Sequence, residues 1–448
     1  MEKSKPQRPA GMQLGGVSLS APGSHSGVKP LQVQDLSMSS RANWHTLMFC
    51  VIGLWVVIGV GLICAHGLGA PVAWWDLIHP FTIGALTTAI IVYSTHFTEA
   101  LTRAATASYR AVAVRIGLVQ VGLILLLFDR AGYDWGVISD VGATVVMAAL
   151  ALHIVAIYQA LRGSLANHFA STVPFYIAAS GFMMLAIVFA ILAGHGVGTY
   201  SALIAAHQRT AVWGFAWLTV TATVITILPT VTGTKISAVA KTRATRSLVI
   251  HCVALGVSAG AFASGHPLIA AVAQLGVVAA AVMIFIPVVD NVLGGSPAWT
   301  SPSASITAGM FWLTALCAAD AAVVAAGTHP RASTVVLLPA FLGAGLLQMV
   351  VGVLTFVTPT LRGGGPLVVK RGRRIAGYGW PARVTLINVG ALLSVAGAVE
   401  PGVMMMAVGL VTGVLATVLS AFLPARRPTD VRVISPTSTL TPTPRTKR

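Results

Sequence analysis

Twelve long apolar stretches constrain this chain more than any other feature of its sequence. Each is close to the ~20 residues that a helix needs to cross a bilayer. Inside lipid the backbone must bond to itself, so such stretches become helices. The sequence therefore predicts an all-α, polytopic membrane bundle of about 12 transmembrane helices. The expected spans are His45–Gly67, Asp76–His96, Ala111–Phe128, Gly136–Leu161, Val173–Ala193, Tyr200–Thr230, Ser247–Ser264, Leu268–Asp290, Ala304–Gly327, Thr334–Thr358, Arg383–Val399 and Val403–Leu423.

The charge composition supports the membrane class and excludes nucleic acid as a partner. Only 9% of the residues are charged, against roughly 25% in a soluble domain. The net charge of +17 comes from basic residues in short loops and tails, where they contact anionic lipid headgroups. No basic nucleic-acid-binding module is present. Membrane lipid is thus the expected partner.

The distribution of Lys and Arg predicts the orientation of the chain. With both termini in the cytoplasm, every basic residue except Arg130, Arg331 and Arg209 falls in or beside a cytoplasmic segment. This follows the positive-inside rule for short loops. We therefore expect a multi-pass protein of the cell (plasma) membrane with an even number of spans.

The domain organisation is predicted to be simple. Residues 1–44 and 425–448 have the composition of disordered basic tails, and 45–424 form one twelve-span domain. We find no internal repeat in the sequence, which weakens an inverted-repeat transporter model.

The sixth span carries polar residues at membrane depth. His207, Gln208 and Arg209 lie about a third of the way into Tyr200–Thr230. A charge at the centre of a spanning helix costs at least ~2.5–3.5 kcal/mol, so such residues usually face the bundle interior and mark a functional site. We take Arg209 as a candidate cofactor-binding residue. Four interactions are possible for its guanidinium: stacking on Trp213, an ion pair with Asp320, binding to a haem propionate, or contact with the outer lipid headgroups.

His79 and His207 are the candidate metal ligands. Both lie one or two helical turns below the outer ends of their spans, and imidazole is a usual ligand for haem iron and copper. The alternative is that each ring satisfies a backbone carbonyl or caps a helix end. Three further intramembrane residues are candidates for supporting roles: Asp320, Gln348 and His153.

Three stretches carry a resemblance to a known family. They are HPFTIGALTTAIIVYSTHFTEALTR (His79 to Arg103), AHQRTAVWGFAWLTVTATVITILPTVTGTKI (Ala206 to Ile236) and FLGAGLLQMVVGVLTFVTPTLRGGGP (Phe341 to Pro366), followed by WPARVTLINVGALL. Together they resemble the membrane region that precedes the cupredoxin domains of actinobacterial multicopper oxidases and copper nitrite reductases. More distantly, they are similar to haem-copper oxidase subunit I and to NnrS-type membrane proteins.

The resemblance implies ligand roles, with clear departures. In the haem-copper pattern a histidine on the second span binds haem and one on the sixth binds copper, which are the places of His79 and His207. The seventh span has only His251, at its opposite end, and the tenth has Gln348 where two histidines are expected. A complete oxygen-reducing binuclear centre is therefore not expected, and the enzyme class stays open.

Three functions follow from these residues. The first is a redox-associated membrane protein that binds haem, copper or both, and acts in electron transfer or copper and nitrogen-oxide handling for a copper protein on the outer side. The second is a transporter in which His207, Arg209 and Asp320 line a substrate or proton path. The third is a non-catalytic assembly subunit that keeps an oxidase-like bundle.

Overall fold

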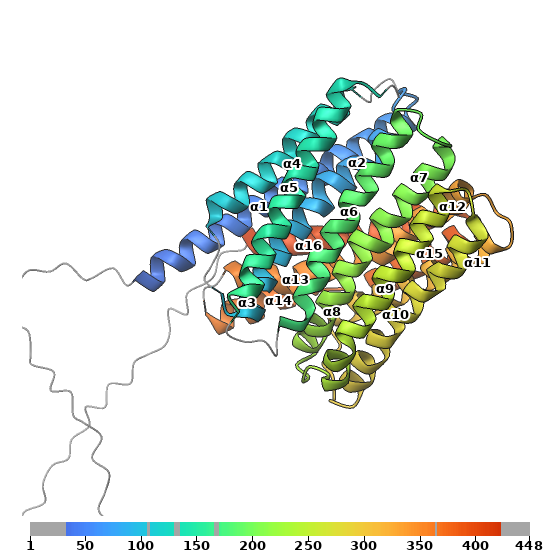
Figure 1. Ribbon diagram of the computed structural model, residues 1–448. Helices are drawn as coiled ribbons and strands as arrows, with labels where there is room; N and C mark the ends of the chain where they lie inside the picture. Colours follow the sequence, from blue (N-terminus) through green and yellow to red (C-terminus); the bar gives the residue numbers. More distant parts are fainter. Residues whose placement is uncertain (1–32, 105–107, 130–134, 165–169, 363–364, 423–448) are drawn as a thin grey trace, which may run out of the picture. The chain divides into compact units, whose positions relative to one another are not determined.

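The computed structural model describes residues 33–104, 108–129, 135–164, 170–362 and 365–422 (Figure 1). Within these ranges the chain is helical and contains no strand. Most of the two predicted tails lies outside the described residues. The first helix, α1 (Val33–Gly67), begins upstream of the predicted start of the first span at His45.

The helices reproduce the predicted spans. Among the helices of the described ranges, eleven are long and apolar enough to cross a membrane, and the shorter apolar α15 occupies the place of the predicted eleventh span. The all-α polytopic bundle is thus confirmed, and the orientation stays a prediction. After α1, the chain forms α2 (Trp74–His79), η1 (Pro80–Thr87), α3 (Thr88–Thr102), α4 (Tyr109–Asp129), α5 (Val137–Arg162), α6 (Val173–Gly194), α7 (Tyr200–Arg209), η4 (Thr210–Ala216), α8 (Trp217–Thr232), α9 (Ala238–Ala263), α10 (Pro267–Leu293), α11 (Ser301–Ala325), α12 (Pro330–Ala340), η5 (Phe341–Leu347), α13 (Gln348–Arg362), α14 (Pro366–Ala376), α15 (Trp380–Val395) and α16 (Val399–Phe422).

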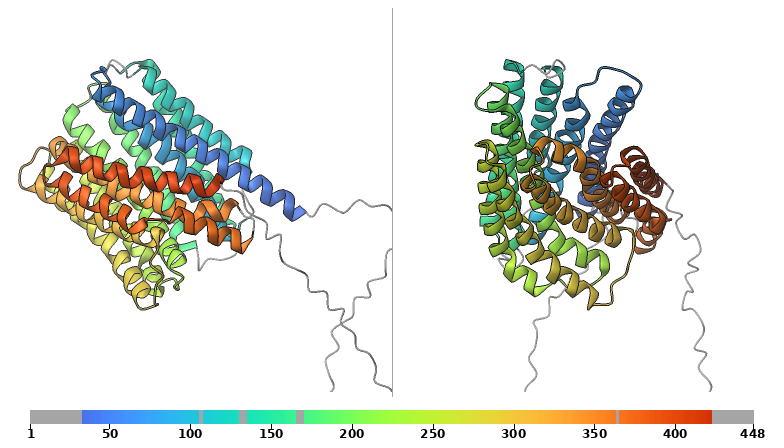
Figure 2. Two further views of the ribbon diagram at one scale, coloured as in Figure 1. Left: turned by 180° about the vertical axis from the view of Figure 1, so that it is seen from behind. Right: turned by 90° about the vertical axis from the view of Figure 1, so that its right-hand side faces the viewer.

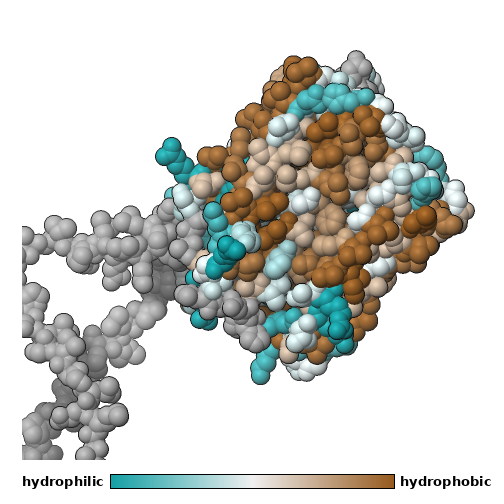
Figure 3. All heavy atoms as spheres, viewed as in Figure 1, coloured by the Kyte–Doolittle hydropathy of each residue, from teal (hydrophilic) through white to brown (hydrophobic). Residues whose placement is uncertain are grey.

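The flank of the bundle is apolar, as a lipid-facing surface requires. Figure 3 shows mostly hydrophobic side chains along the helices, with hydrophilic residues gathered toward their ends. On α9 the exposed Val249, Val253 and Val257 recur at helical spacing along one stripe. A contiguous apolar surface of this kind marks a membrane contact. A multi-pass membrane protein follows.

Three of the spans change their helical form in the middle. The second, sixth and tenth spans each contain a π-helical segment, η1, η4 and η5. π-helical turns are rare and are frequently found at functional sites. Each segment has a glycine as its fifth residue: Gly84, Gly214 and Gly345.

These glycines let a neighbouring helix approach closely. A Cβ atom on Gly84 would lie 2.5 Å from the Trp55 ring of α1, and one on Gly214 would lie 2.5 Å from Phe182 of α6. One on Gly345 would lie 2.6 Å from a side-chain carbon on α11. In all three cases the neighbour is the span that immediately precedes the interrupted one. Small residues allow such close packing between membrane helices.

The backbone form therefore repeats along the chain, although the sequence itself shows no repeat. The spans form three successive sets of four, and in each set the second span carries the π-helical segment against the first. The third and fourth spans of each set, α4 with α5, α9 with α10 and α15 with α16, form the most extensively packed pairs. The colour ramp in Figure 2 lets the reader follow the three sets through the bundle. The repeat is one of backbone form, since few side chains beyond the glycine recur.

Candidate functional site

The first histidine lies where the second span changes form. His79 is the last residue of α2, and Pro80 begins η1. Its Nδ1 is 2.8 Å from the carbonyl oxygen of Trp75, one turn earlier. The two rings are stacked, with centroids 3.9 Å apart and planes 13° from parallel. Trp75 therefore fixes both the hydrogen bond and the face of the imidazole.

The second histidine faces the first from the sixth span. His207 belongs to α7, and its Nδ1 is 2.8 Å from the carbonyl oxygen of Ala186 on α6. The ring centroids of His79 and His207 are 6.5 Å apart, with planes tilted by 32°. The structure thus brings together the two imidazoles that the sequence singled out.

The hydrogen bonds of both rings fix their tautomer. A carbonyl oxygen only accepts, so Nδ1 of each ring must donate its hydrogen. In a neutral imidazole the ring lone pair is then on Nε2. Metal-binding histidines usually donate their other ring N–H to a carbonyl or carboxylate in this way. The alternative expectation, that each ring satisfies a backbone carbonyl, is confirmed, and the metal-binding role stays a prediction that is compatible with it.

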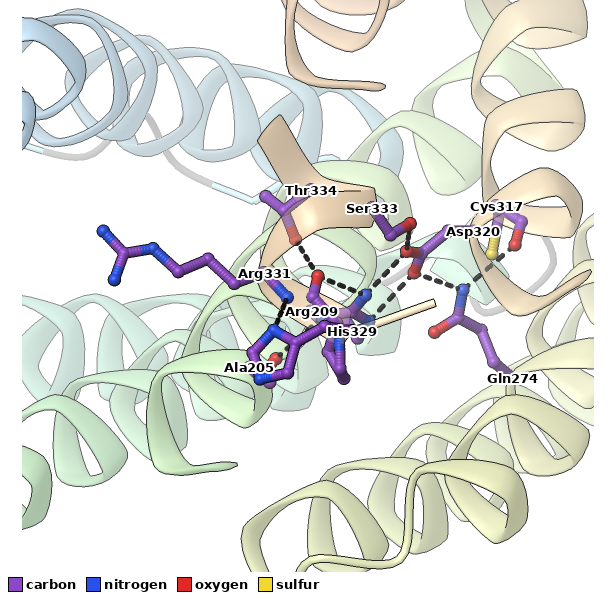
Figure 4. A network of polar contacts seen from close by, with 10 residues as sticks. Ala205, Arg209, Gln274, Cys317, Asp320, His329, Arg331, Ser333 and Thr334 are labelled. Atoms are coloured by element: carbon purple, nitrogen blue, oxygen red, sulfur yellow. Dashed lines mark hydrogen bonds and ion pairs between the residues drawn. The ribbon is translucent and has the colours of Figure 1, made fainter. Parts of the chain in front are cut away.

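Arg209 forms a buried ion pair with Asp320 (Figure 4). Its Nε donates to Asp320 Oδ2 at 2.9 Å, and its Nη2 donates to Oδ1 at 2.6 Å. Nη2 also donates to the carbonyl oxygen of Pro330 at 3.2 Å. The guanidinium lies 4.4 Å from the ring of Phe262, not on Trp213. Of the alternatives for Arg209, the structure selects the pair with Asp320.

Two uncharged side chains also donate hydrogen bonds to the carboxylate of Asp320. Gln274 Nε2 donates to Asp320 Oδ2 at 2.9 Å, and Ser333 Oγ donates to Oδ1 at 2.6 Å. Each oxygen therefore accepts two hydrogen bonds, as Figure 4 shows. A buried ion pair is tolerated when its geometry is good and further hydrogen bonds satisfy its remaining atoms. The network ties α7, α10, α11 and α12 together.

The remaining candidate residues lie in other surroundings. His153 is fully buried, with Nε2 2.9 Å from Ser94 Oγ and Nδ1 3.0 Å from Arg115 Nη1. Because Arg115 only donates, Nδ1 accepts, and the ring is part of a cluster between α3, α4 and α5. Gln348 is buried at the start of α13, and neither atom of its amide group bonds to a described residue. Neither residue hydrogen-bonds to the His79 and His207 pair.

The ligand set around the histidine pair is small. Within the described residues, no group of three or more His, Cys, Asp or Glu side chains is placed to hold a metal ion. On the seventh span, Nε2 of His251 is 2.9 Å from the carbonyl oxygen of Trp213, so it is used within the helix packing. Two imidazoles are therefore the protein ligands that this site offers.

Sequence reasoning missed several partners of these residues. Trp75 lies four residues before His79, a spacing that puts both on one helical face. The contact between them could therefore have been predicted from the sequence. Ser333 carried no such signal, because its contact with Asp320 spans two helices and a loop. Gln274 is a polar residue within a predicted span, and the structure places it in the Asp320 network.

Comparison with known proteins assigns this chain to no family. No protein-family model matches the chain, and no curated protein matches it either. The resemblance to copper-enzyme membrane regions stays a prediction.

Proposed function

We propose that this protein holds a redox metal centre, haem or copper, between the second and sixth spans, with His79 and His207 as its two protein ligands. The observation that carries the proposal is the 6.5 Å separation of the two ring centroids, with both Nδ1 atoms on backbone carbonyls. When two imidazoles bind one metal from opposite sides, the distance between their ring centroids is the sum of two metal–nitrogen bonds of about 2.0–2.1 Å and the two distances from ring centre to nitrogen. That sum is about 6 Å.

The number of ligands fits these two groups better than others. Structural zinc sites need four protein ligands and catalytic zinc sites three, while the described residues offer two here. A haem needs only axial ligands from the protein because the porphyrin supplies the other four nitrogens. Copper(I) accepts two imidazoles. When bound, either group would supply a one-electron carrier.

The chain's own residues contribute orientation and protection from water. Trp75 stacks on His79 and its carbonyl oxygen holds the ring by Nδ1. Ala186 holds His207 in the same way from α6. These outer contacts limit ring rotation and raise the basicity of Nε2.

We further propose that the protein lies in the plasma membrane and exchanges electrons, copper or nitrogen oxides with a copper protein on the outer side. The predicted orientation supports this, because it puts His79 and His207 near the outer surface. The Asp320 network favours a structural role for Arg209, since its charge is already paired within the bundle. We therefore do not propose a transport path through it.

The test is an absorption spectrum and a metal analysis of the detergent-purified protein. We expect a Soret band, or copper near one per chain, that is lost in His79→Ala and in His207→Ala. His66→Ala is the matched control, because His66 is an exposed histidine at the outer end of α1. Wild-type protein with neither haem nor metal would reject the proposal. Co-purification of that empty protein with a copper enzyme would instead support the assembly-subunit function.

A further inference from the structure

A partly open cavity lies beside the Arg209–Asp320 ion pair, between α7 with η4, α11, and α12 with η5. Its empty volume is ≈ 370 Å³, including the mouth. Its lining consists of Gln208, Arg209, Val212, Trp213, Leu316, Asp320, Thr334, Leu337, Leu338 and Phe341.

The lining of the cavity includes a buried hydrogen-bond acceptor that is not paired with any described residue. Oε1 of Gln208 is buried and accepts no hydrogen bond from any residue that the structure describes. Buried polar atoms in folded proteins almost always have a partner, so an unpaired one calls for an explanation. A ligand with a hydroxyl donor would supply that partner.

The charges beside the cavity argue for an uncharged ligand. Arg209 is the cationic residue of the lining and Asp320 the anionic one, and they neutralise each other through two hydrogen bonds. Both oxygens of Asp320 accept a further bond from Gln274 or Ser333. Neither an anionic nor a cationic ligand would therefore find an opposite charge in need of a partner.

The walls of the cavity suit a flat apolar ring. Trp213 and Phe341 meet edge to face, with centroids 5.5 Å apart and planes at 85°. A third ring can stack on one member of such a corner and present its edge to the other, an arrangement that aromatic groups prefer. Leucine and valine side chains form much of the remaining wall.

We propose that this cavity binds an uncharged phenol or hydroquinone from the membrane. Its hydroxyl donates to Gln208 Oε1, and its ring lies against Trp213 and Phe341. The proposal concerns binding only, and it does not rest on the metal site. His79→Ala should lose the metal and keep this binding, so the two proposals fail separately.

The first test compares two probes that differ by one hydroxyl group, 4-decylphenol and decylbenzene. Their binding to the full chain in phosphatidylcholine nanodiscs is measured by calorimetry, with partition into empty nanodiscs subtracted. We expect 4-decylphenol to bind about tenfold more tightly, the effect of one hydrogen bond to a buried acceptor. Gln208→Leu should remove that difference. Equal affinity of the wild-type protein for the two probes would overturn the proposal.

The second test locates the binding by filling the cavity. Leu338→Trp places a bulky side chain in the lining, whereas Val336→Trp adds the same bulk to an exposed residue of the same helix. We expect binding of 4-decylphenol to be lost in the first and unchanged in the second. Unchanged binding in a folded Leu338→Trp protein would place the probe elsewhere and overturn the proposal. If Leu338→Trp does not fold, the Gln208→Leu comparison decides. Displacement of the probe by phosphatidylglycerol would identify a phospholipid as the occupant, and would also overturn it.

Discussion

Removing the carboxylate of Asp320 should destabilise the bundle more than removing any exposed acidic side chain. In Asp320→Leu, the buried guanidinium of Arg209 loses its counter-charge and both of its short hydrogen bonds. Gln274 and Ser333 lose an acceptor as well. Breaking a buried ion pair in this way costs about 3–5 kcal/mol, because the remaining charge stays buried and unpaired.

The double variant gives the sharper test. Arg209→Met with Asp320→Leu removes both charges and leaves apolar side chains of similar size in their place. Such exchanges are often neutral, or stabilising by about 1–4 kcal/mol relative to the ion pair. We therefore expect the double variant to be more stable than either single variant. The two losses are strongly non-additive because the residues are in contact.

The assay is unfolding of the purified protein in mixed detergent micelles, followed by helical circular dichroism. The matched control is Asp140→Leu, which breaks the exposed pair of Asp140 and His195, and we expect a much smaller loss there. If Asp320→Leu is no worse than the control, or if the double variant loses the sum of the two single losses, the reasoning about the buried charge is wrong.

Three further predictions follow from the packing and the topology. Gly214→Val should lower the free energy of unfolding by about 1–3 kcal/mol in the same assay, because its new side chain meets Phe182. Its control is Gly256→Ala, at an exposed position of α9 with nothing within 4 Å of the new Cβ, which should be neutral or slightly stabilising. His153→Leu should cost about 1–3 kcal/mol, because it leaves Arg115 without its buried acceptor, and Arg115→Met with His153→Leu should recover part of that loss. A green fluorescent protein fused after α14 should fluoresce as a cytoplasmic domain, whereas a fusion in the loop between α11 and α12 should not; the reverse result would invert the orientation.

The number, order and class of the helices could be predicted because they depend on one physical quantity. Apolar length decides whether a segment crosses a bilayer, and the loops between the segments are short. The least regular element shows the limit of this reasoning. The predicted span Arg383–Val399 became the shorter helix Trp380–Val395, whose start is set by a loop glycine, Gly379, with a positive φ.

The site was predictable in part, for a different physical reason. Depth along a span follows from residue number, so His79 and His207 could be matched in height, and the rings do lie side by side. The direction in which a side chain points around the helix axis could not be inferred from residue number in the same way. A π-helical turn holds more residues than an α-helical turn, so helical faces assigned with regular α-helical spacing are no longer correct beyond η4. The long-range partner of Arg209 also needed coordinates, because four alternatives fitted its position.

The three widened turns have a consequence for the redesign of this bundle. His79 comes directly before the first of them, Arg209 directly before the second, and Ala340 directly before the third. The third of these positions holds only a methyl group, which makes Ala340 the natural point at which to graft a new polar or ligating side chain.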